Sequence, residues 1–173
     1  MEGCSGLVVE GTYAGQPAII KLYGPDDEGL DVCQQEVAAY GALAAVQGRL
    51  VPRLLGTGHA KDGVWFVALE ALPGVPLSRL MPLPATVAAA ALAALRELHN
   101  AVQGFVHGDI RLANILFVEG GGDAGGRGGD GRPDGAPKAG GRCVIVDLGM
   151  ARLGAAVEEV QAEQRLLERL LGA

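Results

Sequence analysis

Eleven residues from His107 to Phe117, HGDIRLANILF, constrain the fold most, because they place two strongly polar side chains in a mainly apolar stretch. Asp109 and Asn114 lie five positions apart in this stretch. Burying a carboxylate and a carboxamide without partners costs free energy, so both groups must pair with other polar groups or coordinate a ligand. Oxygen donors of this kind are typical ligands of Mg²⁺, particularly where phosphate groups complete the coordination.

A second motif follows further along the chain, where Cys143 to Gly149 reads CVIVDLG. It is an apolar strand that ends in an aspartate, a bulky residue and a glycine. Together, HGDIRLAN and DLG resemble the catalytic loop (H-R-D-x-x-x-x-N) and the metal-binding D-F-G of the protein kinase superfamily. The glycine at position 108 replaces the arginine of H-R-D, as it does in aminoglycoside phosphotransferases and several atypical kinases. Control by a phosphorylated activation loop that pairs with that arginine is therefore not expected.

The resemblance implies an α+β fold of truncated bilobal protein kinase-like type. One lobe would be a small antiparallel β-sheet with one helix, and the other a reduced helical lobe. Residues 1–173 would form a single kinase-like domain, with the first lobe at about 1–70 and the second at about 71–173. Only 26 residues follow Asp147, without an A-P-E motif, so the large helical lobe that binds peptide substrates in kinases has no room.

The resemblance also implies roles for single residues. Asp109 would orient or deprotonate the acceptor hydroxyl, while Asn114 and Asp147 would hold Mg²⁺ against the phosphates of ATP. Arg111 occupies the position of the catalytic-loop lysine and would stabilise the transferring phosphoryl group. His107 is expected to be structural and to pack beneath the loop.

Lys21 and Glu36 form a further expected pair. Glu36 shares one helical face with several apolar residues, and a charge on a buried face requires a cation. Lys21, at the end of AIIK in a predicted strand, is the natural candidate and resembles the kinase lysine that contacts the nucleotide phosphates. Taken singly, a lysine at a strand end can be merely solvated, and Glu36 can extend its carboxylate to water. The face that carries Glu36 includes Val32, Ala39, Tyr40 and Leu43.

The nucleotide-binding loop and the hinge between the lobes match in part. Gly3, Gly6 and Val8 resemble the later positions of G-x-G-x-x-G-x-V, whose first glycine would fall at Met1. Glycine lets backbone amides approach phosphate oxygens closely, although a flexible chain start would look the same. Glu70 and Leu72, in FVALEALPG, resemble the hinge that offers backbone groups to adenine. An ordinary strand running into a Pro-Gly turn is the alternative.

Periodicity and turn residues predict the element order. A β-hairpin opens the chain, a helix with Asp31 as its N-cap follows, and two short strands lead to a turn-rich PGVP segment. A second helix begins at Pro84 with Val87, Ala91, Leu95 and Leu98 on one face, two strands follow, and an amphipathic helix closes the chain. The predicted strands are 6–13 and 17–23 in the hairpin, two short strands around 54 and at 64–69, and 114–118 and 142–146 later in the chain. The predicted helices are 31–46, 84–99 and 157–171, and the predicted turn is 73–76.

Residues 119–142 differ in composition from the rest of the chain, because they hold eleven of its 28 glycines. Such a segment has almost no apolar surface to bury and cannot offset the entropy lost on ordering. We expect a disordered insertion between two strands.

Charge and cysteine content exclude several classes. The net charge is −6 without a block of Lys or Arg, so neither nucleic acid nor a membrane surface is an expected partner. Cys4, Cys33 and Cys143 are far apart and lack metal-ligand spacing, so no disulfide framework or zinc site is indicated. No apolar run reaches the roughly eighteen residues that a membrane span needs. A cytoplasmic or nuclear location fits these properties.

Two functions compete at this stage. The first is an ATP-binding phosphotransferase that uses Mg²⁺ to transfer the γ-phosphoryl group to a hydroxyl acceptor, with protein Ser/Thr ahead of a small molecule. It is favoured because all five motif residues are present: Lys21, Glu36, Asp109, Asn114 and Asp147. The alternative is a nucleotide-binding pseudokinase or interaction module without turnover, favoured by the short second lobe and the partial glycine motif.

Overall fold

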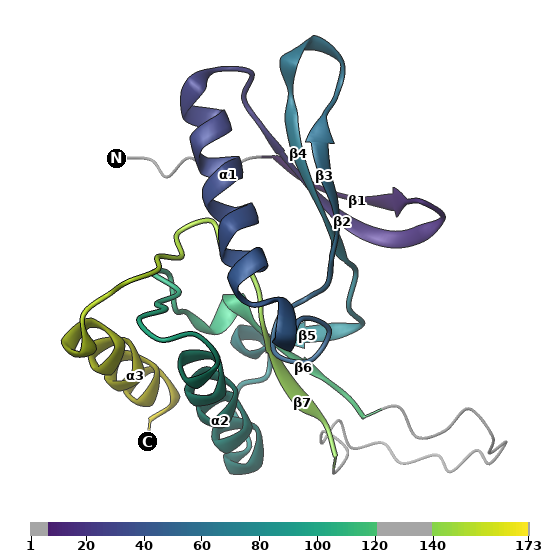
Figure 1. Cartoon of the computed structure of the whole chain (residues 1–173). Coiled ribbons are helices and arrows are strands. Elements are labelled where there is room, and N and C mark those ends of the chain that lie inside the picture. The colour runs from purple at the N-terminus through teal and green to yellow at the C-terminus, as the bar shows by residue number, and fades with distance from the viewer. Residues whose placement is uncertain (1–6, 121–139, 173) are drawn as a thin grey trace, which may run out of the picture.

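The computed structural model describes residues 7–120 and 140–172 (Figure 1). Within these residues the chain is an α+β protein with two antiparallel β-sheets and three α-helices. The α+β prediction is therefore confirmed. Gly3, Gly6 and most of the glycine-rich insertion lie outside the described residues, so the expectations for them stay predictions.

The first sheet has four strands in the order β1-β2-β4-β3. Its strands are β1 (Leu7–Tyr13), β2 (Gln16–Tyr23), β3 (Leu54–His59) and β4 (Trp65–Glu70). The turn between β1 and β2 has positive φ at both Ala14 and Gly15, which matches the right-handed twist of a hairpin. The predicted hairpin and the two later strands are confirmed.

Helix α1 (Asp27–Ala42) packs against β2 and β4. The predicted N-cap, Asp31, is wrong, because it lies one turn inside the helix. The cap is Asp26, whose Oδ1 accepts a hydrogen bond from the Gly29 amide at 2.8 Å. Gly29 permits this early start, since a Cβ there would meet the Gly24 carbonyl oxygen at 2.3 Å. The helix also ends earlier than predicted, and a short 3₁₀ turn (Ala44–Val46) follows it.

The second sheet has three strands in the order β5-β6-β7, namely β5 (Gly74–Pro76), β6 (Ile115–Val118) and β7 (Arg142–Ile145). The prediction of a mere turn at Pro73 to Pro76 is wrong, because Gly74–Pro76 pairs with β6 as an edge strand. Proline is tolerated there, since an edge strand has one side without ladder hydrogen bonds. The other two strands, β6 and β7, match the sequence prediction closely.

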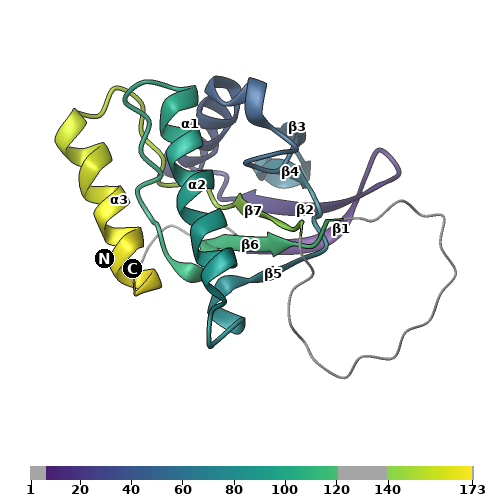
Figure 2. The ribbon, with the colours of Figure 1, turned by 90° about the horizontal axis from the view of Figure 1, so that it is seen from below.

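Helices α2 (Ala85–Ala101) and α3 (Val157–Leu171) cover the second sheet on one side. Seen from below, α2 lies between α3 and the β5-β6-β7 sheet (Figure 2). The predicted apolar face of α2 is buried, and α3 spans its predicted range. At the start of α3 Val157 is exposed, and further along Glu163 is buried.

One cluster of buried apolar side chains runs from α1 through β4 and β7 to α2 and α3. Strand β7 is also linked through the backbone to the segment before β3, because the Ile145 amide donates to the Leu50 carbonyl at 2.8 Å. This packing brings the end of β2, the middle of α1 and the second residue after β7 to one place. In the part of the chain that is described, no helix is both long and apolar enough to cross a bilayer.

Candidate active site

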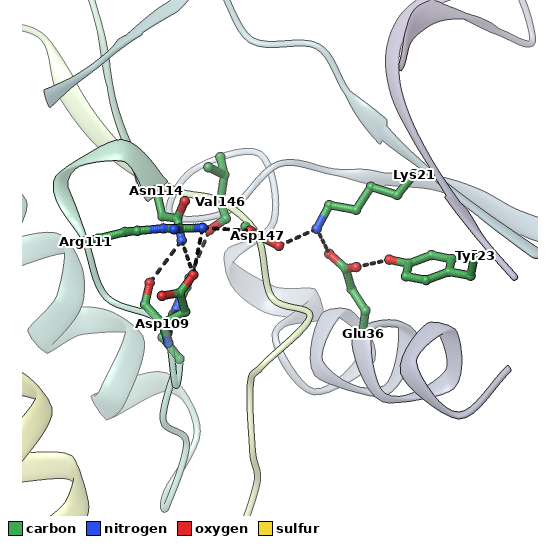
Figure 3. A network of polar contacts seen from close by, with 9 residues as sticks. Lys21, Tyr23, Glu36, Asp109, Arg111, Asn114, Val146 and Asp147 are labelled. Carbon is green, nitrogen blue, oxygen red and sulfur yellow. Dashed lines mark hydrogen bonds and ion pairs between the residues drawn. The ribbon is translucent and has the colours of Figure 1, made fainter. Parts of the chain in front are cut away.

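Lys21 joins residues from three distant parts of the sequence. It lies in β2 on the face that α1 covers, and its Nζ is 2.7 Å from Glu36 Oε1 and 2.7 Å from Asp147 Oδ1 (Figure 3). The predicted pairing of Lys21 with Glu36 is therefore present. Glu36 is fully buried, whereas the side chain of Asp147 is 42% exposed. The ammonium group thus links a buried carboxylate to one that faces solvent.

We call Lys21, Glu36 and Asp147 the junction at Lys21, and their charges stabilise one another. Burial alone lowers the pKa of Lys21, but the carboxylates of Glu36 and Asp147 outweigh it and raise that pKa above its ordinary value. Burial alone raises the pKa of Asp147, but Lys21 and Arg111 bring it below its ordinary value. Lys21 is therefore a cation and Asp147 an anion at neutral pH. An ammonium group has three hydrogens, and two point at these acceptors, so the third has no acceptor within the described residues.

Asp147 has a left-handed backbone conformation, with φ at 68°. This region is uncommon for a residue other than glycine, and such strain persists only where the surrounding structure enforces it. The preceding residue is held firmly, because the Val146 amide donates to the Asn114 carbonyl at 2.9 Å. With this backbone conformation, the Asp147 carboxylate points toward Lys21 (Figure 3).

The loop from His107 to Asn114 supplies the other half of the site. Asn114 Nδ2 donates to the Asp109 carbonyl at 3.0 Å and to Asp109 Oδ2 at 2.9 Å. Arg111 Nη2 lies 3.0 Å from the same Oδ2 and 3.9 Å from Asp147 Oδ2. Both polar contacts of the Asp109 carboxylate within the described residues thus fall on Oδ2. Its Oδ1 has no polar partner among the described residues.

His107 is buried beneath this loop, as the sequence predicts. Its Nδ1 accepts the Asp109 amide at 3.2 Å, so Nε2 carries the proton and donates it to the Val146 carbonyl at 2.9 Å. Burial lowers the pKa of His107, which keeps the ring neutral. His107 thus ties the Asp109 backbone to the residue before Asp147.

Glu163 of α3 supports the loop from the other side, and sequence reasoning missed it. Its carboxylate accepts the His107 amide at 3.0 Å, the Gly108 amide at 2.8 Å and His99 Nε2 at 2.8 Å. Burial alone raises the pKa of Glu163, but these hydrogen bonds bring it below its ordinary value. One signal was available, because Glu163 lies four residues before Leu167 on the face of α3 that packs inward.

Tyr23 was also missed. It lies two residues after Lys21 and so faces the same side of β2, and its hydroxyl donates to Glu36 Oε2 (Figure 3). Alternation along the strand was the signal that could have found it. A second tyrosine, Tyr40, is fully buried one turn beyond Glu36, and its hydroxyl has no hydrogen-bond partner in the described part of the chain.

Besides Lys21, the described residues predicted to contact the nucleotide are Val8, Glu70 and Leu72. Val8 is half exposed on the edge strand β1, opposite Lys21 in register. In the predicted hinge, the Glu70 amide donates to the Arg53 carbonyl and the Leu72 carbonyl accepts the Gly74 amide, so these two groups already have partners in the chain. Their roles stay predictions.

The side-chain oxygens of Asn114 and Asp147 are of the kind that Mg²⁺ prefers as ligands. Asn114 donates through Nδ2 to Asp109, so its Oδ1 remains as a possible metal ligand. Mg²⁺ commonly takes one or two protein oxygens and completes its shell with water and phosphates. The described residues contain no group of three or more His, Cys, Asp or Glu side chains that could hold a metal alone. Asn114 and Asp147 therefore suit a metal that arrives with phosphates.

A hollow of about 440 Å³ lies elsewhere, between α1 and the segment 151–155. None of the predicted site residues lines it. The hollow therefore does not mark the junction at Lys21.

Comparison with known proteins adds no assignment. No protein family model matches the chain, and no curated protein matches it significantly. A function must therefore be argued from the arrangement of these residues.

Proposed function

We propose that the chain is a protein kinase-like phosphotransferase that moves the γ-phosphoryl group of ATP to a hydroxyl acceptor. The observation that carries the proposal is the junction at Lys21. Glu36 and Asp147 both lie 2.7 Å from its Nζ, and Asp109, Arg111 and Asn114 lie beside Asp147. These residues come from separate segments and meet in the relation that phosphoryl transfer uses.

In this proposal the four-stranded sheet and α1 form a small first lobe. The three-stranded sheet with α2 and α3 forms a reduced second lobe, and the nucleotide binds between them. Val8 would lie over the phosphates, and the backbone from Glu70 to Leu72 would contact adenine. The phosphate-binding roles predicted for Gly3 and Gly6 concern residues outside the described part of the chain. Together these assignments form the truncated bilobal arrangement that the sequence motifs imply.

The charge balance supports a requirement for a divalent cation. Three carboxylates, Glu36, Asp109 and Asp147, surround two cations, Lys21 and Arg111. A triphosphate would add further negative charge, so it needs a counter-ion to bind here. Asn114 Oδ1 and Asp147 would hold Mg²⁺, which supplies charge neutralisation of the phosphates when bound. The third hydrogen of Lys21 Nζ would donate to a phosphate oxygen.

Asp109 is suited to act as the base. Its Oδ2 is held by Asn114 and Arg111, which leaves Oδ1 to accept the proton of the acceptor hydroxyl. The acceptor oxygen bonds to the γ-phosphorus as the bond to the β,γ-bridging oxygen breaks, and ADP leaves with that oxygen. Arg111, with a side chain 57% exposed, is free enough to follow the charge on the transferring group.

A nucleotide-binding module without turnover is the second candidate. It is favoured by the ion pair between Arg111 and Asp109, which already occupies one oxygen of the base. The two candidates share nucleotide binding and differ in whether a phosphoryl group is transferred.

Nucleotide binding and transfer can be tested separately. ATP that binds the native state should raise the melting temperature only when Mg²⁺ is present. Asp109→Asn should keep ATP affinity within a few-fold but reduce transfer to a panel of proteins and small alcohols at least about a hundredfold. Asp147→Asn should weaken Mg²⁺-dependent ATP binding about tenfold or more, because a charge-assisted contact is lost.

The matched control is Asp31→Asn, since Asp31 is an exposed aspartate of α1. It should change neither property. If wild type shows no thermal shift with millimolar ATP and Mg²⁺, both candidates fail. If wild type binds ATP but transfers no more than Asp109→Asn does, the module without turnover replaces the enzyme.

A further inference from the structure

Each oxygen of the buried Glu36 carboxylate has its own donor. Lys21 Nζ donates to Oε1 at 2.7 Å, and the Tyr23 hydroxyl donates to Oε2. Glu36 has no exposed surface, and Tyr23 is only 5% exposed, so water does not compete for either oxygen. The phenol comes from β2, the same rigid strand that carries Lys21. The strand thus holds the carboxylate at both oxygens.

Lys21 alone cannot fix the position of Glu36, because Lys21 is also held by Asp147 at the same 2.7 Å. A glutamate carboxylate with one partner can rotate about its terminal torsion, which is broad. A second donor on a strand removes that rotation. Burial and the charge of Glu36 raise the pKa of Tyr23, so the hydroxyl stays protonated and remains a donor.

We infer that Tyr23 is a positioning residue: it orients Glu36 so that Oε1 holds Lys21 in place for the phosphates. The inference deepens the proposed function and rests on it for its kinetic consequence. Its structural part, the placement of Lys21 through Glu36, holds with or without a nucleotide. The two parts therefore have separate readouts.

The chain offers a matched control in Tyr40. Tyr40 lies on α1 one turn beyond Glu36, is fully buried, and has a hydroxyl without a hydrogen-bond partner among the described residues. Tyr23→Phe and Tyr40→Phe each delete one buried phenolic oxygen and keep the ring. Only Tyr23→Phe removes a donor from Glu36.

The first readout needs no nucleotide. Brief treatment with an amine-acylating reagent, followed by peptide mass spectrometry, gives the labelling rate of Lys21 relative to that of the exposed Lys61. Tyr23→Phe should raise the relative rate about threefold or more, because a loosely held ammonium is both more accessible and more easily deprotonated. Tyr40→Phe should match wild type.

The second readout is kinetic. Lys21 would contact the phosphates in the ground state and in the transition state alike, so a poorly placed Lys21 weakens uniform binding. Tyr23→Phe should raise KM for MgATP about three- to tenfold and leave kcat within about twofold, the size expected for one lost hydrogen bond. In a Glu36→Leu background, Tyr23→Phe should add little, because Glu36→Leu has already removed the acceptor of the Tyr23 hydroxyl.

An unchanged Lys21 labelling rate in folded Tyr23→Phe would overturn the inference, whatever the nucleotide data show. Equal increases in Tyr23→Phe and Tyr40→Phe would also overturn it, since loss of buried packing would then explain both. If Tyr23→Phe melts below the assay temperature, the labelling is repeated at a temperature at which this variant is folded, and its Lys21 rate must still exceed that of wild type. A raised labelling rate in a protein that binds no MgATP supports the placement of Lys21 and rejects the proposed function.

Discussion

Two buried glutamates lie on opposite sides of the candidate site and are held in different ways. Glu36 of α1 binds two side chains, Lys21 and Tyr23, and Lys21 also reaches the half-exposed Asp147. Glu163 of α3 binds two backbone amides and His99. Glu36 thus holds the side chain of Lys21, whereas Glu163 holds the backbone of the loop that leads to Asp109.

The largest expected effect is on stability and comes from Glu163. Glu163→Ala should lower the free energy of unfolding by about 3 kcal/mol, because it leaves buried donors without an acceptor. Glu163→Gln should cost less, since its amide oxygen still accepts a hydrogen bond. Denaturant titration measures both. A loss below about 1 kcal/mol for Glu163→Ala would show that the loop does not depend on this carboxylate.

Replacing Glu36 by glutamine should affect MgATP binding more than the same replacement of Glu163 does. Glu36→Gln should lower the free energy of unfolding by about 2 kcal/mol and weaken MgATP binding about tenfold, because Lys21 loses its charged partner. Glu163→Gln should leave MgATP binding nearly unchanged while it slows transfer, since it supports the backbone that carries Asp109. Titration calorimetry with MgATP on both variants tests the contrast. Equal losses of affinity would remove the distinction between the two glutamates.

The stability contributions of His107 and Lys21 should be lost at opposite ends of the pH range. His107 has a folded-state pKa below the ordinary 6.5, so the unfolded chain binds more protons and stability falls as pH drops below about 6.5. The slope from this one group is at most about 1.4 kcal/mol per pH unit. Asp147 and Glu163, with lowered pKa values, add losses in the same direction at lower pH.

Lys21 behaves oppositely, because its folded-state pKa lies above the ordinary 10.5. Its contribution is complete below pH 10.5 and is lost only as the pH rises through the folded-state value. Denaturant titrations from pH 5 to 7 should show a shallower slope for His107→Gln than for wild type. The exposed His59→Gln should keep the wild-type slope. Identical slopes in all three proteins would contradict the assignment to His107.

The smallest expected effects concern the starts of the two helices that carry the glutamates. Asp26 caps α1 with its side chain, so Asp26→Ala should cost about 1 kcal/mol of stability. Ala156 precedes α3 in an extended conformation but has no side-chain acceptor, so Ala156→Ser should add about 0.5 kcal/mol. Thermal unfolding of both variants measures these changes. A gain from Asp26→Ala would show that α1 does not depend on this cap.

Local sequence patterns were sufficient for most of the elements. The hairpin, the buried face of α2 and the range of α3 follow from periods of two and 3.6 residues and from turn residues, which act within a few positions. The errors were also local. Asp31 looked like a cap because the pattern did not show that Gly29 lets the chain pass close to Gly24, and Gly74–Pro76 became a strand only because β6 lies beside it.

The sequence alone determined which residues had to find polar partners. A charge on the apolar face of α1 and polar groups within HGDIRLAN had to be paired, and Lys21, at the end of a predicted strand, was the candidate partner for Glu36. The third partner, Asp147, lies 126 positions from Lys21, and only the packing of the two sheets brings them together. Tyr23 and Glu163 likewise acquire their roles from contacts across elements. The periodicity of apolar residues predicts which side of a helix or strand is buried. Which buried polar groups contact one another is decided only by the tertiary structure, because these contacts depend on how elements far apart in sequence pack.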